Sequence, residues 1–191
     1  MPQYKIESQL SVFRLVGRYS MKKHKNIVLI GMPGVGKSTV GVLLAKQRGF
    51  SFLDTDIYIQ TRESKSLQEL IKENGLSGFC DLEEEYIRSI AVDSHVIATG
   101  GSVIYRHQAM EHLQQSGLII YLDIGLDRLK KRLDDVNARG VVIAPGQNLG
   151  DLHAERHPLY SKYAHASINT DGLTPDQVVR DVVESLNTAS S

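Results

Sequence analysis

Short apolar runs separated by longer amphipathic stretches dominate the chain from residue 26 onward. Five runs have the length and composition of strands: 26–30, 50–56, 95–99, 118–124 and 165–170. Most are apolar at consecutive positions, as is typical of parallel strands that are covered on both faces. The remaining stretches have helical patterns: 37–48, 66–73, 81–93, 106–116, 126–135, 149–163 and 175–187. This alternation predicts an α/β fold with a doubly wound, parallel, five-stranded sheet.

Two segments do not follow this pattern. Residues 1–20 show no clear period and precede a second methionine, Met21. We expect an N-terminal extension there, either a disordered tail behind an upstream start codon or a short packed element. The stretch 136–149 contains Gly140, Pro145 and Gly146, which predicts a mobile loop or lid. Residues 21–191 would then form a single domain.

Composition narrows the class of protein. Lys plus Arg and Asp plus Glu balance at 22 each, which gives no overall attraction to nucleic acid or to an anionic membrane. No apolar run approaches the roughly 18–20 residues of a membrane span. Cys80 is the sole cysteine, so no intramolecular disulfide can form and a reducing compartment fits best. We therefore expect a cytoplasmic protein, and a monomer.

The segment from Gly31 to Ser38, GMPGVGKS, matches the phosphate-binding pattern G-x-x-x-x-G-K-[ST] in full. It follows a predicted strand and opens a predicted helix, which is the context that this pattern requires. Glycines let backbone N–H groups turn toward phosphate oxygens, and the helix N-terminus favours the same anions. Lys37 would reach the β- and γ-phosphates, and Ser38 would hold Mg²⁺. The predicted nucleotide-binding residues are Gly34, Val35, Gly36, Lys37, Ser38 and Thr39.

The alternative is a glycine-rich turn that carries an exposed lysine and binds no nucleotide. Among nucleotide-binding proteins, the lack of an N-K-x-D guanine signature argues against a GTPase, and the small size argues against a motor ATPase. A small-molecule kinase that uses ATP and Mg²⁺ fits best.

Candidate ligand-binding residues follow two further strands, at the sheet edge where ligands bind in such folds. After the second strand, Asp54 and Asp56 could serve as a magnesium ligand and as the acceptor of a hydroxyl proton, or simply as a helix N-cap. After the third strand, Gly100 and Gly101 form either a ligand-approaching turn or a plain one. Late in the chain stands Arg156, and a lone arginine is usually a solvated charge.

Taken together, these residues resemble the shikimate kinase family over about residues 26–186. The resemblance rests on the phosphate-binding loop and five further features: Phe52–Asp56, Val96–Gly101, Arg139, Arg156–Tyr160 and the stretch 169–175. It implies a fold like that of nucleoside monophosphate kinases, with a mobile lid. It also implies transfer of the γ-phosphoryl group of ATP to a hydroxyl of a small molecule, shikimate above all.

The resemblance assigns roles on the acceptor side. Asp56 would contact the acceptor hydroxyls and act near the chemistry, while Asp54 would help to order Mg²⁺. Gly100 and Gly101 would approach the acceptor, and Arg156 would bind its carboxylate.

On the nucleotide side, the resemblance places Arg132 against the adenine ring. Arg139 would close over the phosphates with the lid, beside Lys37.

Three motifs depart from the family pattern. The family's F-R-x-x-E element, whose arginine pairs with the carboxylate of shikimate, is here Phe79-Cys80-Asp81-Leu82-Glu83. The third glycine of the family's G-G-G turn is Ser102, and the usual R-P-L-L of the lid is R-G-V-V from Arg139. Arg88 and Arg106 are the candidates to supply the missing charge. The alternatives to shikimate are another small polyol or hydroxy acid, or a nucleotide-binding module without catalysis.

Overall fold

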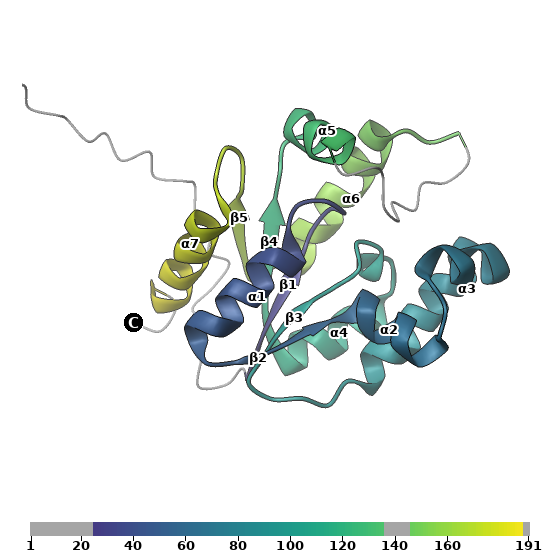
Figure 1. Ribbon diagram of the computed structural model, residues 1–191, viewed down its shortest axis with the longest axis horizontal. Coiled ribbons are helices and arrows are strands. Elements are labelled where there is room, and N and C mark those ends of the chain that lie inside the picture. Colours follow the sequence, from purple (N-terminus) through teal and green to yellow (C-terminus); the bar gives the residue numbers. More distant parts are fainter. Residues whose placement is uncertain (1–24, 136–145, 189–191) are drawn as a thin grey trace, which may run out of the picture.

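The computed structural model describes residues 25–135 and 146–188, and the predicted five-stranded sheet is present in them (Figure 1). All neighbouring strands are parallel, in the order β2-β3-β1-β4-β5. The strands are β1 (Asn26–Ile30), β2 (Ser51–Asp54), β3 (His95–Ala98), β4 (Gly117–Asp123) and β5 (Ala166–Asn169). The central β1 is buried at every position, which explains its unbroken apolar sequence.

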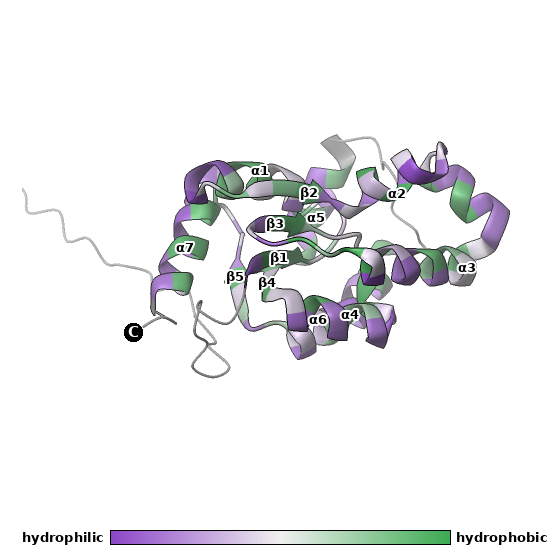
Figure 2. Ribbon diagram, turned by 90° about the horizontal axis from the view of Figure 1, so that it is seen from below, coloured by the Kyte–Doolittle hydropathy of each residue, from purple (hydrophilic) through white to green (hydrophobic). Residues whose placement is uncertain are grey.

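Helices cover both faces of the sheet (Figure 2): α1 and α7 lie on one face, and α4 and α6 lie on the other. The elements are α1 (Lys37–Arg48), α2 (Thr55–Glu63), α3 (Leu67–Ser89), a 3₁₀ turn η1 (Val103–Tyr105), α4 (His107–Ser116), α5 (Leu126–Asp135), α6 (Leu149–Tyr163) and α7 (Pro175–Thr188). As the sequence predicts, α7 starts at Pro175, and the hydroxyl of Thr174 accepts a hydrogen bond from the backbone of Gln177.

The structure corrects two predicted boundaries. The expected helices 66–73 and 81–93 merge into α3, which ends at Ser89 rather than at residue 93 and is interrupted only at Gly75, where φ is 68° and ψ is 175°. Glycine accepts this left-handed φ without the clash of a Cβ, so the chain resumes the helix after one irregular residue. The predicted strand 50–56 ends at Asp54, because the side chain of Asp54 caps α2.

The register of the parallel strands brings their carboxyl ends to one edge of the sheet. Leu29 of β1 lies opposite Ala98 of β3, which in turn lies opposite Asp54 of β2. The loop after β1, the residues after β2 and the turn after β3 therefore meet at this edge. No helix in the two described ranges is long and apolar enough to cross a membrane. The predicted extension 1–20, most of the predicted lid and Arg139 lie outside those ranges.

Candidate active site

The loop between β1 and α1 has the backbone of a phosphate cradle. Gly34 and Gly36 have φ values of 81° and 105°, a region that residues with a Cβ rarely adopt. A Cβ at Gly31 would lie 2.5 Å from the carbonyl oxygen of Leu122 in the neighbouring strand. The loop conformation thus depends on glycine at these positions. The first turn of α1 carries no acidic residue that would repel an anion at this helix N-terminus.

Lys37 points back into this loop. Its Nζ donates hydrogen bonds to the carbonyl oxygens of Gly31, at 2.7 Å, and Met32, at 3.0 Å. Burial lowers the pKa of Lys37 to about 8, although the nearby carboxylates of Asp56 and Asp54 oppose this shift. A buried cation that is held only by two carbonyls is well placed to exchange them for phosphate oxygens.

Ser38 and Asp54 lie side by side at the mouth of the loop. The Ser38 hydroxyl donates to Asp54 Oδ2 at 2.6 Å, while Oδ1 of the same carboxylate accepts from the backbone N–H groups of Asp56 and Ile57. The N-cap interpretation of Asp54 is therefore confirmed, while its second oxygen faces Ser38, as a shared magnesium site would require. The exposed Thr39 follows in the first turn of α1.

Asp56 stands in the first turn of α2 and faces a narrow pocket. The pocket has a volume of about 30 Å³ and is lined by Pro33, Asp56, Leu67, Phe79, Gly100, Gly101, Ser102 and Arg156. All four acceptor-binding residues predicted from the sequence are thus brought together; this pocket is called the inner pocket below. Burial raises the pKa of Asp56 to about 6, with Lys37 opposing the shift and Asp54 adding to it.

Arg156 is not a solvated charge. It is 1% exposed, and its Nε donates to the hydroxyl oxygen of Tyr105 at 3.0 Å, with the guanidinium carbon 5.1 Å from the centre of that ring. Tyr160, one turn later on α6, donates its hydroxyl proton to the carbonyl oxygen of Gly101 at 2.7 Å. Helix α6 is therefore fixed to the glycine turn, and this attachment sets where Arg156 lies.

The contact between Glu83 and Ser102 was not predicted from the sequence. Glu83 on α3 is buried and accepts a hydrogen bond from the Ser102 hydroxyl at 2.7 Å, while its Oε1 has no hydrogen-bond partner in the part of the chain that the structure describes. Burial raises the pKa of Glu83 to about 7, and the hydrogen bond from Ser102 opposes this. A Cβ at Gly100 would collide with Glu83, so this turn must be glycine. Glu83 and Ser102 are distant in sequence, and no local pattern predicts their contact.

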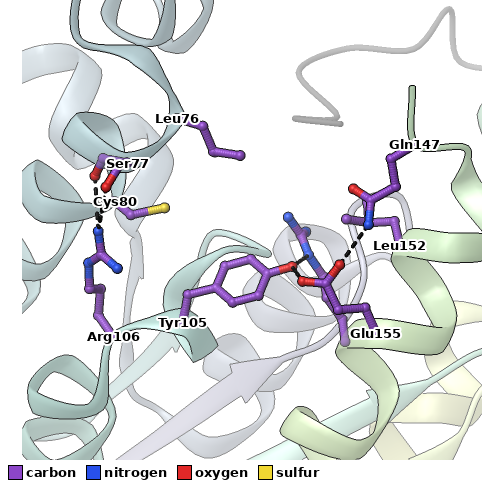
Figure 3. Close-up of a pocket in the computed structure, with 9 residues that line it drawn as sticks. Leu76, Ser77, Cys80, Tyr105, Arg106, Gln147, Leu152 and Glu155 are labelled. Carbon is purple, nitrogen blue, oxygen red and sulfur yellow. Dashed lines mark hydrogen bonds between the residues drawn. The ribbon is translucent and has the colours of Figure 1, made fainter. Parts of the chain in front are cut away.

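A larger cavity adjoins the inner pocket through Arg156, which lines both. This outer cavity, of about 560 Å³, is lined by Leu76, Ser77, Cys80, Tyr105, Arg106, Gln147, Leu152, Glu155 and Arg156 (Figure 3). Of the two arginines considered as substitutes for the one missing at position 80, Arg106 lines this cavity. Arg88 is exposed near the end of α3 and does not.

Arg132 on α5 lies against the phosphate-binding loop. Its Nη1 donates to the carbonyl oxygen of Val35 at 2.7 Å, and a Cβ at Gly34 would lie 2.8 Å from the side chain of Leu133. The end of α5 therefore packs on the loop, at the border of the predicted nucleotide site.

Comparisons with known proteins agree with this geometry. The family model described as shikimate kinase matches residues 33–187. The shikimate kinase of Thermodesulfovibrio yellowstonii is 39% identical over 163 residues, which are 84% of this chain and 94% of that protein. The solved structure of shikimate kinase from Acinetobacter baumannii in complex with shikimate has a TM-score of 0.80 at 29% identity, covering 88% of this chain and 96% of that one. The structure from Aquifex aeolicus has a TM-score of 0.70 at 29% identity, covering 85% and 96%. By sequence and by structure, this chain is a member of the shikimate kinase family.

Proposed function

We propose that this enzyme transfers the γ-phosphoryl group of ATP to a hydroxyl of shikimate. The observation that carries the proposal is the inner pocket, which gathers Asp56, Gly100, Gly101 and Arg156 beside Lys37 and its loop. The Acinetobacter baumannii relative, of the same fold, was solved with shikimate bound. Relatives that are named shikimate kinase argue against a different acceptor and against a module without catalysis.

On the donor side, the loop amides and Lys37 would bind the phosphates of ATP. Exchange of the two loop carbonyls for phosphate oxygens would bring the Lys37 ammonium to the β- and γ-phosphates. Arg132, which already contacts the loop, would extend along the adenine, and Thr39 would contact the phosphates. Arg139 would complete the charge around the γ-phosphoryl group.

Ser38 and Asp54 fit a magnesium ion. They place a hydroxyl and a carboxylate oxygen 2.6 Å apart beside the phosphate cradle, and Mg²⁺ is commonly bound by one or two protein oxygens together with substrate phosphates and waters. No group of three or more His, Cys, Asp or Glu side chains in the described residues could hold a metal without such help. When bound, the ion would neutralise charge on the phosphate oxygens.

On the acceptor side, Asp56 would orient the attacking hydroxyl and take its proton. The hydroxyl oxygen forms a bond to the γ-phosphorus while the bond from that phosphorus to the bridging oxygen of ADP breaks, and the proton passes to the Asp56 carboxylate. A pKa of about 6 leaves this carboxylate mostly ionised at neutral pH, yet basic enough to accept the proton. Arg156 would hold the acceptor by its carboxylate and thereby position the hydroxyl.

We propose that the enzyme acts as a monomer, because no step proposed above requires a residue from a second chain. With one cysteine in 191 residues, it suits a reducing compartment, and we place the reaction in the cytoplasm.

The test is a coupled assay of ADP release with shikimate, quinate, gluconate, homoserine and inositols in parallel. We expect shikimate to support turnover far better than the others, with a phosphorylated product visible by ³¹P NMR. Turnover with another acceptor, and none with shikimate, would overturn the proposed acceptor. ATP binding without turnover on any of them would favour a nucleotide-binding module.

A further inference from the structure

The lining of the outer cavity holds more cationic than anionic side chains, although Asp81, which is not part of the lining, pairs with Arg106. The lining contains two arginines, Arg106 and Arg156, and one carboxylate, Glu155. Both oxygens of Glu155 already accept hydrogen bonds, Oε1 from the Tyr105 hydroxyl at 2.7 Å and Oε2 from Gln147 Nε2 at 2.6 Å (Figure 3). Within the described residues, Arg156 forms no ion pair with any carboxylate. A half-enclosed space with this balance of charge suits an anionic group of a ligand.

Arg106 is fastened from one side only. Its Nη2 contacts the carbonyl oxygen of Ser77 at 3.1 Å, the Ser77 hydroxyl at 3.3 Å and Asp81 Oδ1 at 2.7 Å. Among the described residues, the buried Nε has no hydrogen-bond partner, and Nη1 forms no hydrogen bond. In Figure 3 the second terminal nitrogen points away from Ser77, toward the side of the cavity where Tyr105 lies. The guanidinium is thus held in place with donors to spare.

Arg106 also lies at the wall of the cavity to which an arginine at position 80 would contribute. Ser77, to which it is fastened, lies one turn before Cys80 on α3, and all three residues line the outer cavity. Charge from both Arg106 and Arg156 acts on the Cys80 thiol. Arg106, at the junction of η1 and α4, therefore supplies a guanidinium to the wall of the cavity at which Cys80 has only a thiol.

We propose that Arg106 binds the carboxylate of the acceptor together with Arg156, and so takes over the role that position 80 lacks. This proposal rests on the proposed function, because it assumes a hydroxy acid whose reacting hydroxyl lies in the inner pocket at Asp56. Its carboxylate then reaches past Arg156 to the edge of the outer cavity, between two arginines that approach from α6 and from the η1–α4 junction. Such a site selects the carboxylate over an ester or alcohol of the same shape.

The test compares Arg106→Gln with the wild-type protein, using shikimate and its methyl ester as acceptors. Loss of one charge-assisted contact should raise the KM for shikimate about 10- to 100-fold, while the Kd for ATP stays unchanged. The KM for the ester should change less than about 3-fold, because the ester carries no charge for Arg106 to bind. Arg106→Lys should recover part of the loss, since a lysine keeps the charge without the planar fork.

Three further variants separate binding from structural support. Adding Cys80→Arg to Arg106→Gln should restore a low KM for shikimate, because the guanidinium returns to the same wall of the cavity. Arg88→Gln removes an exposed arginine of α3 outside the cavity and should leave the KM unchanged. Asp81→Asn breaks the ion pair of Arg106 without removing its guanidinium, so it should change the KM less than about 3-fold.

An unchanged KM for shikimate in Arg106→Gln would overturn the proposal, and so would an equal loss for shikimate and ester. An Asp81→Asn variant as impaired as Arg106→Gln would also overturn it, since Arg106 would then act only by joining α3 to α4. If the wild-type protein neither binds nor phosphorylates shikimate, the proposed function itself fails, and that result is visible before any variant is made.

Discussion

The Ser38 hydroxyl lies 2.6 Å from Oδ2 of Asp54, although the two residues stand 16 positions apart and belong to different strand–helix units. The contact joins the phosphate-binding loop to the start of α2, the helix that also carries Asp56. Donor and acceptor sides of the proposed reaction meet at this pair.

The double role of Asp54 can be separated by two substitutions. Asn is as good an N-cap as Asp, so Asp54→Asn should keep the thermal stability of the protein while raising the Mg²⁺ concentration needed for half-maximal activity at least 10-fold. Asp54→Ala should raise the magnesium requirement in the same way and also remove the cap, at a cost of about 1 kcal/mol in the free energy of unfolding. Magnesium titrations of kcat, alongside thermal melts, check both. Equal magnesium requirements in Asp54→Asn and the wild-type protein would exclude Asp54 as a metal ligand.

Lys37→Ala tests the phosphate cradle. Removal of this buried ammonium should weaken binding of Mg²⁺–ATP in calorimetry and lower kcat by roughly 10²–10³-fold, as for other groups that face developing charge. Lys46→Ala, an exposed lysine of the same helix, is the matched control and should leave both quantities unchanged. Unaltered ATP affinity together with a lost kcat would mean that Lys37 acts chiefly in the transition state. A Lys37→Ala protein with full activity would refute its assigned role.

The pKa of Asp56, raised to about 6, predicts the acid limb of the pH profile. Because the proposed base is the ionised form, kcat/KM for the acceptor should fall tenfold per pH unit below about pH 6. ATP affinity, measured over the same range, serves as the reference. Asp56→Asn should abolish this limb and lower kcat by about 10²–10⁴-fold. A pH profile that stays flat down to pH 4.5 would show that Asp56 is not the titrating base.

The raised pKa of Glu83 predicts that the stability of the protein depends on pH. This pKa, raised to about 7, means that the native protein holds this proton more tightly than the unfolded chain does. The contribution to stability is complete below about pH 4.5 and is lost as the pH rises through about 7, by roughly 3 kcal/mol in total. Glu83→Gln keeps a neutral group that can still accept from Ser102, so its denaturant midpoint should depend less on pH between 5 and 8. Glu85→Gln, on the exposed face of α3, should retain the wild-type dependence. The same slope in Glu83→Gln and wild type would contradict this assignment.

Residues close together in sequence were the easiest to predict. β1 and α1 have the predicted bounds because an unbroken apolar run and a glycine-rich turn determine them locally. The inner pocket was also predictable, since the ends of parallel strands share one edge, and this brought Asp56 and Gly100 together. In contrast, the burial of Arg156 depends on how α6 packs on the glycine turn, and no local pattern encodes that packing. Likewise, the choice between Arg88 and Arg106 depends on which arginine lines the outer cavity.

The hydrogen bonds of Lys37 to the carbonyls of Gly31 and Met32 have a consequence for small anions. A ligand that draws the ammonium away must compensate for two carbonyl acceptors left without their donor inside the protein. One phosphate group offers little beyond that exchange, whereas a triphosphate also engages the loop amides along its length. We therefore expect free inorganic phosphate to compete poorly with the nucleotide for this site, because the two hydrogen bonds of Lys37 must be broken in either case.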